Sequence, residues 1–305
     1  MLNTLNDVLN NVDNFIWGMP LIILILFTGI LLTVRLRGLQ VRHLGKALQY
    51  EVHNEDVGEG EVTSFGALCT ALSATIGTGN IVGCATAIVA GGPGALFWMW
   101  LAAFFGMATK YAEGMLAVKY RVIAEDGHAL GGPFYYIEKG MGKNFKWLAK
   151  LFCVFGTMVG LFGIGTFTQV NGITSAVNNF FDPSNVHMIS LFGRNYSISV
   201  VVAGIIVTIC VGLVIIGGIK RISKVSEVIV PFMAVTYIGV CLIIVFTHLP
   251  QVPAAFAEIV QSAFGLKAVA GGAIGAMTVA MQKGIARGIF SNEAGLGSAP
   301  IAAAA

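Results

Sequence analysis

Residues 73–83 read SATIGTGNIVG and lie near the middle of a segment, residues 63–90, that contains no charged side chain. A segment of this length and apolar composition can cross a lipid bilayer as a helix. Glycine, threonine and asparagine are poor helix formers, so the helix is expected to unwind within this stretch. The alternative is that Gly77, Gly79 and Gly83 let a neighbouring helix pack closely against an unbroken one.

An unwound stretch would leave backbone groups free at a depth where water cannot satisfy them. Irregular backbone inside a bilayer is tolerated only where it is buried in protein or lines a cavity. Carbonyl oxygens, together with threonine and asparagine oxygens, suit a hard cation such as Na⁺. The N–H groups that begin the following half-helix suit an anion such as a carboxylate. The stretch therefore predicts a cation and a carboxylate bound side by side, which is typical of transporters.

The composition of the chain indicates a membrane protein and excludes several other classes. Hydrophobic residues make up 56% of the chain and charged residues 11%, whereas soluble domains carry about 25% charged residues. A net charge of +3 gives no reason to expect a nucleic-acid partner. The five cysteines have no metal-ligand spacing, and no Ser-His-Asp or HExxH arrangement is present, so neither an enzyme nor a bound cofactor is expected.

Hydropathy divides the chain into seven predicted membrane spans within one all-α domain. The spans cover residues 15–36, 63–90, 95–118, 148–181, 196–219, 228–247 and 266–290. Lysine and arginine collect in the loops after spans one, three and five, and the opposite loops are poor in them. Because basic loops stay in the cytoplasm, the N-terminus is expected outside. The chain stops within an apolar run at residues 302–305, so further helices are expected to follow it.

Two further spans contain positions that could complete a site. Span seven carries a second glycine-rich stretch, residues 271–278, and two broken spans one structural repeat apart are typical of a transporter site. In span four, Gln169 lies within a run of 31 charge-free residues, 151–181. A buried amide needs hydrogen-bond partners, so Gln169 is expected to bind either a substrate or a neighbouring helix. Phe167 beside it is more typical of core packing.

Two pairs of charged residues lie within or next to the predicted spans. Lys110 and Glu113 are three positions apart and can meet on one helix face, so structural pairing, or snorkelling near the cytoplasmic end, is favoured over a proton relay. Arg287 and Glu293 are expected to form either a cytoplasmic gate or a simple anchor at the membrane surface.

Four stretches of the chain are long and specific enough to indicate a family. They are residues 74–81 (ATIGTGNI), 91–95 (GGPGA), 105–113 (FGMATKYAE) and 291–300 (SNEAGLGSAP). They closely resemble the alanine/glycine:cation symporter family, or sodium:alanine symporters, and the resemblance covers essentially the whole chain. It implies sodium-coupled transport of alanine or glycine. It also implies a leucine-transporter-like inverted-repeat core, here the first five-helix repeat and the first helix of the second, with one extra N-terminal helix, in a prokaryotic plasma membrane.

The resemblance also implies roles for individual residues. In the leucine-transporter-like fold the first core helix unwinds at a Gly-x-Gly-Asn sequence, which residues 77–80 match. The implied sodium ligands are the Asn80 side chain and the Thr75 carbonyl for one ion, the Ser73 and Ile76 carbonyls for a second, and Thr278. The implied substrate-binding residues are Thr78, Gly79, Asn80, Phe167, Gln169, Ile274 and Gly275. Family members continue with several more helices, so part of the second sodium site and of the substrate wall is expected outside this chain.

These observations lead to one main hypothesis and two alternatives. Na⁺ and a small neutral amino acid are expected to bind between spans two, four and seven, around which the two repeats rock by alternating access. One alternative is a cation channel whose filter uses the same carbonyls. The other is a membrane protein that binds an amino acid without moving it. The expected partners are Na⁺, alanine or glycine, and membrane lipid, with the oligomeric state open.

Overall fold

The chain folds almost entirely into helices. A computed structural model describes residues 2–52, 61–191, 193–266 and 272–305. The helices are α1 (Leu2–Ile16), α2 (Met19–Arg35), α3 (Leu39–Arg42), α4 (Leu44–Val52), α5 (Ser64–Thr75), α6 (Thr78–Gly91), α7 (Gly94–Tyr120), α8 (Pro133–Met141), η1 (Lys143–Phe145), α9 (Lys146–Phe162), α10 (Ile164–Phe181), α11 (Ile198–Ile215), α12 (Gly218–Thr247), η2 (Leu249–Gln251), α13 (Val252–Ala263), α14 (Ala273–Asn292) and α15 (Ala299–Ala304). Two antiparallel hairpins lie between helices: β1 (Val122–Ile123) with β2 (Ala129–Leu130), and β3 (Met188–Leu191) with β4 (Arg194–Ser197). The helical class predicted from the sequence is therefore confirmed, with the two short hairpins as additions.

Four helical segments in the described part of the chain are long and apolar enough to cross a membrane. They are Ser64–Gly91, Lys143–Phe181, Ile198–Ile215 and Gly218–Thr247, which coincide with predicted spans two, four, five and six. Large apolar side chains on these helices are exposed, as expected for surfaces that face lipid. The α2 helix is apolar but has 17 residues. That the first, third and seventh predicted spans cross the membrane stays a prediction.

Helix boundaries differ from the predicted spans at three places. Gly18 separates α1 from α2 inside the first predicted span. Gly163, with φ +59°, divides the fourth into α9 and α10. The α12 helix begins at Gly218, well before the predicted start at residue 228. The apolar segment is interrupted by the basic residues 220–224, so hydropathy places the start of the span after them. The helical backbone continues through these residues because lysine and arginine are good helix formers.

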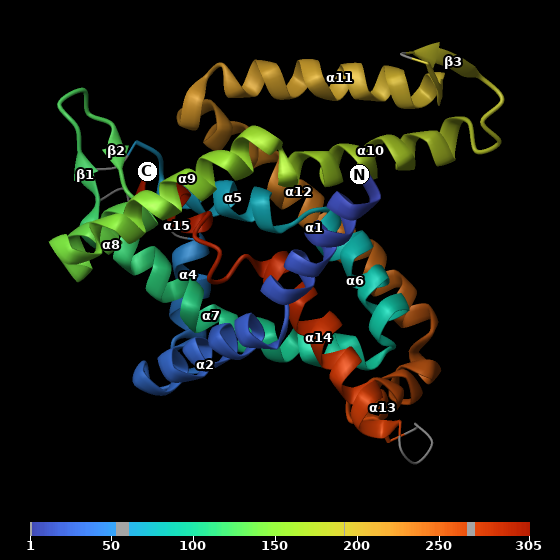
Figure 1. Cartoon of the computed structure of the whole chain (residues 1–305), viewed down its shortest axis with the longest axis horizontal. Coiled ribbons are helices and arrows are strands. Elements are labelled where there is room, and N and C mark those ends of the chain that lie inside the picture. The colour runs from blue at the N-terminus through green and yellow to red at the C-terminus, as the bar shows by residue number, and fades with distance from the viewer. Residues whose placement is uncertain (1, 53–60, 192, 267–271) are drawn as a thin grey trace.

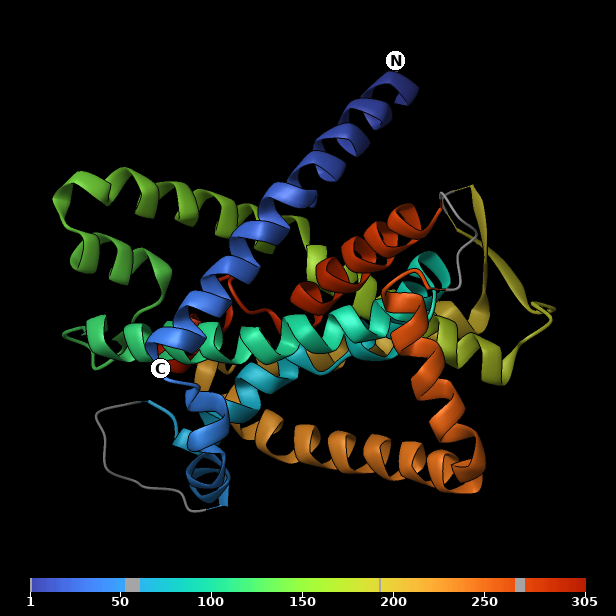
Figure 2. The ribbon, with the colours of Figure 1, turned by 90° about the horizontal axis from the view of Figure 1, so that it is seen from below.

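The buried core lies where α2, α7 and α14 cross. Ile22 of α2, Ala102 of α7, and Ile285 and Ile289 of α14 form one cluster. A second cluster joins α6 to α7. Figure 2 shows α7 running across the middle of the molecule, with α1 projecting away from it toward the N-terminus. The α7 helix is therefore the scaffold against which α6 and α14 are placed.

Small residues allow α14 to pack directly on the backbone of α7. A methyl group at Gly284 would lie 2.3 Å from the Ala95 carbonyl oxygen and 2.9 Å from Trp98 Cβ. One turn later, a methyl group at Gly288 would lie 3.3 Å from Met99 Cα. This is the spacing of small residues at which membrane helices approach most closely. The contact fixes α14, and hence the segment that follows it, relative to α6 and α7.

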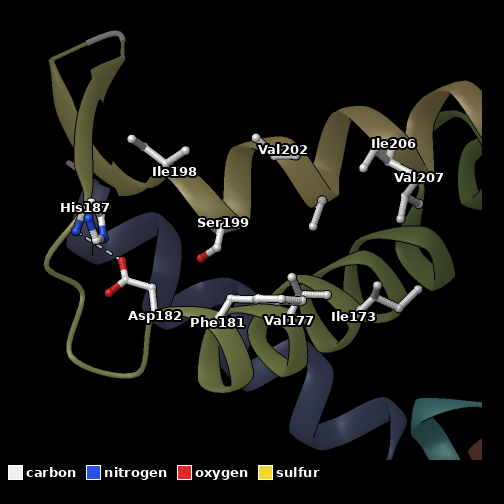
Figure 3. A pocket seen from close by; sticks show the side chains of 11 residues that line it. Ile173, Val177, Phe181, Asp182, His187, Ile198, Ser199, Val202, Ile206 and Val207 are labelled. Atoms are coloured by element: carbon white, nitrogen blue, oxygen red, sulfur yellow. Dashed lines mark hydrogen bonds between the residues drawn. The ribbon is translucent and has the colours of Figure 1, made fainter.

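The α10 and α11 helices lie side by side and are joined at one end by the β3–β4 hairpin (Figure 1). Asp182 fixes this connection by accepting hydrogen bonds from the Val186 and His187 N–H groups and from Ser197 Oγ. These bonds, led by that of Val186, lower the pKa of the Asp182 carboxyl. A pocket of about 660 Å³ lies between the two helices. Figure 3 shows Asp182 at one end of it. Its walls are mainly isoleucine and valine, so they offer few groups for a zwitterionic ligand.

Candidate functional site

The helical path is interrupted between α5 and α6, within the stretch that the sequence singled out. The α5 helix ends at Thr75, and α6 begins at Thr78. Between them Ile76 has ψ +103°, and Gly77 is extended with φ −166° and ψ −151°. The predicted break is therefore confirmed, and the unbroken-helix alternative is wrong here. The break places the ends of two half-helices inside one 28-residue apolar segment.

Gln169 of α10 reaches this break from the side. Its Oε1 accepts hydrogen bonds from the Thr78 N–H at 3.1 Å and from Thr78 Oγ1 at 2.9 Å. Helix α10 can come this close because both facing positions are glycine. A methyl group at Gly77 would lie 2.7 Å from Gln169 Nε2, and one at Gly172 would lie 2.5 Å from Thr78 Cγ2. The side chain thus satisfies a donor that the first turn of a helix leaves free.

Asn80 of α6 reaches back across the break to α5. Its Nδ2 donates a hydrogen bond to the Thr75 carbonyl at 3.2 Å. The structure therefore brings together the two residues implied for the first sodium ion. The hydroxyl of Thr75 donates to the Ala71 carbonyl and that of Ser73 to the Thr70 carbonyl, so both hydroxyls are engaged within α5. Carbonyl oxygens and the Asn80 amide are then the candidate cation ligands at this break.

Phe167 does not accompany Gln169 to the break. It is 71% exposed, and its ring lies over Gly163, where a methyl group would be 3.3 Å from Phe167 Cε2. Residues two positions apart on a helix do not share a face, so Phe167 and Gln169 cannot both point at Thr78. A substrate contact from Phe167 stays a prediction.

A break was predicted at residues 271–278, and the structure contradicts it over the residues of this stretch that it describes. Gly271 lies outside the described residues, Gly272 is the N-cap of α14, and residues 273–278 form regular helix. Thr278 Oγ1 donates to the Ile274 carbonyl at 2.7 Å within that helix. Ile274 is 77% exposed, and a methyl group at Gly275 would meet nothing within 4 Å. The glycine-rich start of α14 therefore stays helical, and the roles of these three residues stay predictions.

A second interruption occurs later, between α14 and α15. Glu293 ends α14 with φ +55°, and Gly295 and Gly297 also have positive φ, at +86° and +80°. Glu293 accepts a hydrogen bond from Ser298 Oγ at 2.9 Å. Residues 291–300 indicate the family, but no break was predicted there. Their glycines and Pro300, at spacings that end helices, were the available signal.

Lys110 and Glu113 hold this second interruption in place. Lys110 Nζ donates to the Asn292 carbonyl at 3.1 Å, and Glu113 Oε2 accepts from the Gly295 N–H at 3.2 Å. No ion pair joins Lys110 to Glu113 among the described residues, so the predicted mutual pairing is wrong. Their spacing does put them on one face of α7. That face meets backbone groups, however, and each of the two side chains hydrogen-bonds to one of these groups instead of pairing with the other side chain.

Arg287 likewise finds a partner other than Glu293. Its Nη2 donates to Thr86 Oγ1 of α6 at 3.1 Å, and its side chain covers Gly83, where a methyl group would lie 3.0 Å from Arg287 Cδ. No ion pair with Glu293 forms in the described part of the chain, so the predicted gate pair is absent there. Arg287 instead fastens α14 to α6, the half-helix that begins at the break.

Taken together, Gln169 and Asn80 bring neutral side chains to the first break, and they offer hydrogen-bond donors and acceptors for a small zwitterion. The described residues contain no group of three or more His, Cys, Asp or Glu residues that could hold a metal ion. A cation at this break would therefore be bound by neutral oxygens, which suits Na⁺ better than a transition metal.

Comparison with known proteins shows strong similarity to one family. Residues 2–305 match the model of the sodium:alanine symporter family. The chain is 55% identical over 303 residues to an uncharacterized transporter of Haemophilus influenzae, covering 99% of this chain and 63% of that protein. It is 46% identical to the sodium/alanine symporter AgcS of Methanococcus maripaludis, covering 98% and 63%. It is 40% identical to the probable sodium/glutamine symporter GlnT of Bacillus subtilis, covering 100% and 59%. The chain thus spans about three fifths of the length of these relatives.

Proposed function

The chain belongs to the sodium:alanine symporter family, and from that premise we propose that it carries the site of a sodium-coupled symporter for alanine or glycine. The family is one of transporters, which agrees with the absence of an enzyme signature in the sequence. The observation that carries the proposal is the break between α5 and α6, where Gln169 and Asn80 converge on the exposed backbone ends.

The substrate carboxylate is proposed to bind at the start of α6. The Thr78 N–H and hydroxyl already hold a carbonyl oxygen there, that of Gln169. A carboxylate is a stronger acceptor than an amide, and it also interacts favourably with the positive end of the α6 dipole. On binding, the carboxylate displaces Gln169 Oε1 from Thr78, and the amide turns so that Nε2 donates to it. Gln169 would thus accept hydrogen bonds from Thr78 in the empty site and donate one to the substrate in the loaded site.

The sodium ions are proposed to bind on the α5 side of the same break. Asn80 turns its side-chain oxygen toward the ion and joins the Thr75 carbonyl in holding it. The carbonyls of Ser73 and Ile76 serve a second ion, with Thr278 as a further ligand. An ion placed here lies beside the substrate carboxylate, so each charge stabilises the other in a medium of low dielectric constant. That mutual stabilisation is the physical basis for coupling.

The surrounding architecture is proposed to be leucine-transporter-like. In this assignment α2 is the extra leading helix, α5 and α6 form the first core helix, and α14 opens the second, inverted repeat. The N-terminus is placed outside the cell because the basic loops follow spans one, three and five. Ile274, Gly275 and Phe167 would approach the substrate only in a conformation other than the one described, as alternating access requires.

The direct test is uptake of radiolabelled alanine by the purified protein in liposomes, with and without an inward sodium gradient. We expect accumulation that requires the gradient and is reduced by unlabelled glycine. Unlabelled glutamine is the informative competitor, because relatives are named for both alanine and glutamine transport. Uptake that ignores sodium would contradict the coupling. Unsaturable sodium current would indicate a channel, and binding without uptake would indicate a receptor.

Replacing Asn80 with alanine is expected to weaken the response to sodium rather than to remove transport. The substitution takes away a side-chain ligand but leaves the Thr75 carbonyl in place. Loss of one interaction with a charged group corresponds to roughly a tenfold higher sodium concentration for half-maximal uptake. Asn195→Ala, at an exposed position of β4, is the matched control. An Asn80→Ala protein with an unaltered sodium dependence would remove Asn80 from the cation site.

A further inference from the structure

A polar pocket lies away from the break, where the N-terminal ends of α5 and α12 meet. It has a volume of about 470 Å³ and is lined by residues from the start of both helices. Lys220, Arg221 and Lys224 supply three positive charges, and Glu61 and Glu227 supply two negative ones. By this count, three minus two, the pocket keeps one positive charge.

The three cations are available to a ligand. All three side chains are exposed, and none takes part in an ion pair among the described residues. Arg221 Nη1 donates to the Leu213 carbonyl at 2.9 Å, which uses one of its five N–H groups. Lys220 and Lys224 are four positions apart, so they extend from the same face of α12.

The two carboxylates are already engaged with other groups. Glu61 accepts hydrogen bonds from the Ala129 N–H and pairs with His128 Nδ1, each at 2.9 Å. The Ala129 bond, followed by the interaction with His128, lowers the pKa of Glu61, and attraction to Lys220 adds a smaller effect. Glu227 Oε1 accepts from Thr63 Oγ1 at 3.2 Å and from Ser223 Oγ at 3.4 Å. Neither carboxylate is bound to one of the three cations, so an incoming anion need not displace an ion pair.

Two helix N-termini add to the positive potential. Thr63 is the N-cap of α5 and lines the pocket. Lys220 and Arg221 lie in the first turns of α12, which has no acidic residue in its first turn. Cations at this end of a helix are unfavourable because the helix dipole already makes it positive. An anion in the pocket would relieve this repulsion at both helices.

We propose that this pocket binds the phosphate of an anionic phospholipid at the membrane surface. Two exposed apolar residues are the chain neighbours of pocket-lining residues: Ile216, next to Gly217, is 83% exposed, and Val228, next to Glu227, is 71% exposed. Acyl chains can lie against these residues while the headgroup occupies the pocket. Clusters of basic residues beside a membrane helix recognise anionic lipid in this way. The site is separate from the break, so it does not depend on the proposed transport function.

The test is lipid binding by the purified protein, measured by native mass spectrometry in detergent. Phosphatidylglycerol is titrated against phosphatidylethanolamine as the zwitterionic reference. We expect phosphatidylglycerol to bind more tightly to the unaltered protein, and the double variant Lys220→Gln/Lys224→Gln to weaken that binding by about tenfold or more. The control is Lys119→Gln/Lys143→Gln, which removes the same charge at exposed positions outside the pocket.

Three results would overturn the proposal. The first is an equal loss of binding in the control variant, which would indicate general attraction to charge. The second is equal affinity for the two lipids. The third is displacement of phosphatidylglycerol by millimolar inorganic phosphate, which would identify a site for a soluble anion. Size-exclusion profiles and alanine uptake, measured on the same variants, separate failure of the lipid site from misfolding or failure of transport.

Discussion

Replacing Gln169 with leucine is expected to remove nearly all sodium-driven amino-acid uptake from a protein that still folds. Leucine fills a similar volume but cannot accept a hydrogen bond, so the Thr78 N–H and hydroxyl lose their partner. Thr78 is only half-buried, so water can replace this partner in the empty site, and the substrate carboxylate is proposed to replace it in the loaded one. The larger effect is loss of the proposed Nε2 donor to the charged carboxylate, a hydrogen bond worth about 1.5–3 kcal/mol. Uptake should therefore fall by on the order of a hundredfold.

A second variant at the same position separates the two roles of Gln169. Gln169→Glu keeps an oxygen for Thr78, so the break should remain as stable as in the unaltered protein. Its negative charge, however, lies where the substrate carboxylate is proposed to bind, so uptake should still be lost. Thr168→Val is the control, because it removes an exposed hydroxyl of α10 that donates to the Gly165 carbonyl within the same helix. Full uptake by Gln169→Glu would contradict a carboxylate site at Thr78.

Replacing Gly284 with valine is expected to destabilise the fold more than any other single change considered above. Even one methyl group there would lie 2.3 Å from the Ala95 carbonyl oxygen. Backbone of α7 cannot turn aside as a flexible side chain could, so α14 must shift as a whole. Overpacking of a buried position typically costs about 1–3 kcal/mol, and a rigid backbone neighbour places this case at or above the upper end.

The measurement is the midpoint of thermal unfolding in detergent, followed by size-exclusion chromatography. Gly114→Val is the matched control, since it places the same side chain in α7 where nothing lies within 4 Å of the added Cβ. We expect a large loss of the folded fraction for Gly284→Val and a small change for Gly114→Val. Equal unfolding midpoints for the two variants would contradict the close α7–α14 contact.

The glycine-rich stretches show where sequence reasoning succeeds and where it fails. At residues 73–83 the prediction of a break is confirmed, whereas at residues 273–278 the same kind of composition forms continuous helix. Low helix propensity describes both stretches, because propensity is a property of the local sequence. Glycine also lets helices pack closely, and α14 uses Gly284 and Gly288 for that purpose on α7. Composition alone does not distinguish unwinding from close packing.

The hydrogen-bond partners of polar side chains were still harder to predict from the sequence, because they depend on the tertiary structure. Lys110 and Glu113 share a helix face as their spacing predicts, yet both bind backbone groups of the segment after α14. That segment is about 180 positions away along the chain. A sequence pattern within one helix predicts which residues share a face. It does not predict which other element packs against that face.

Composition, local propensity and motifs were enough to predict a helical chain that is apolar enough for a membrane, a break near Gly77 in its second span, and the family that it resembles. Composition and propensity act over a few residues, so a short stretch of sequence carries them. The contacts of Gln169 with Thr78 and of Asn80 with Thr75, and the second interruption after Asn292, depend on packing between distant segments. A hydrogen bond forms with whichever group packing brings within reach, and packing is a property of the whole chain.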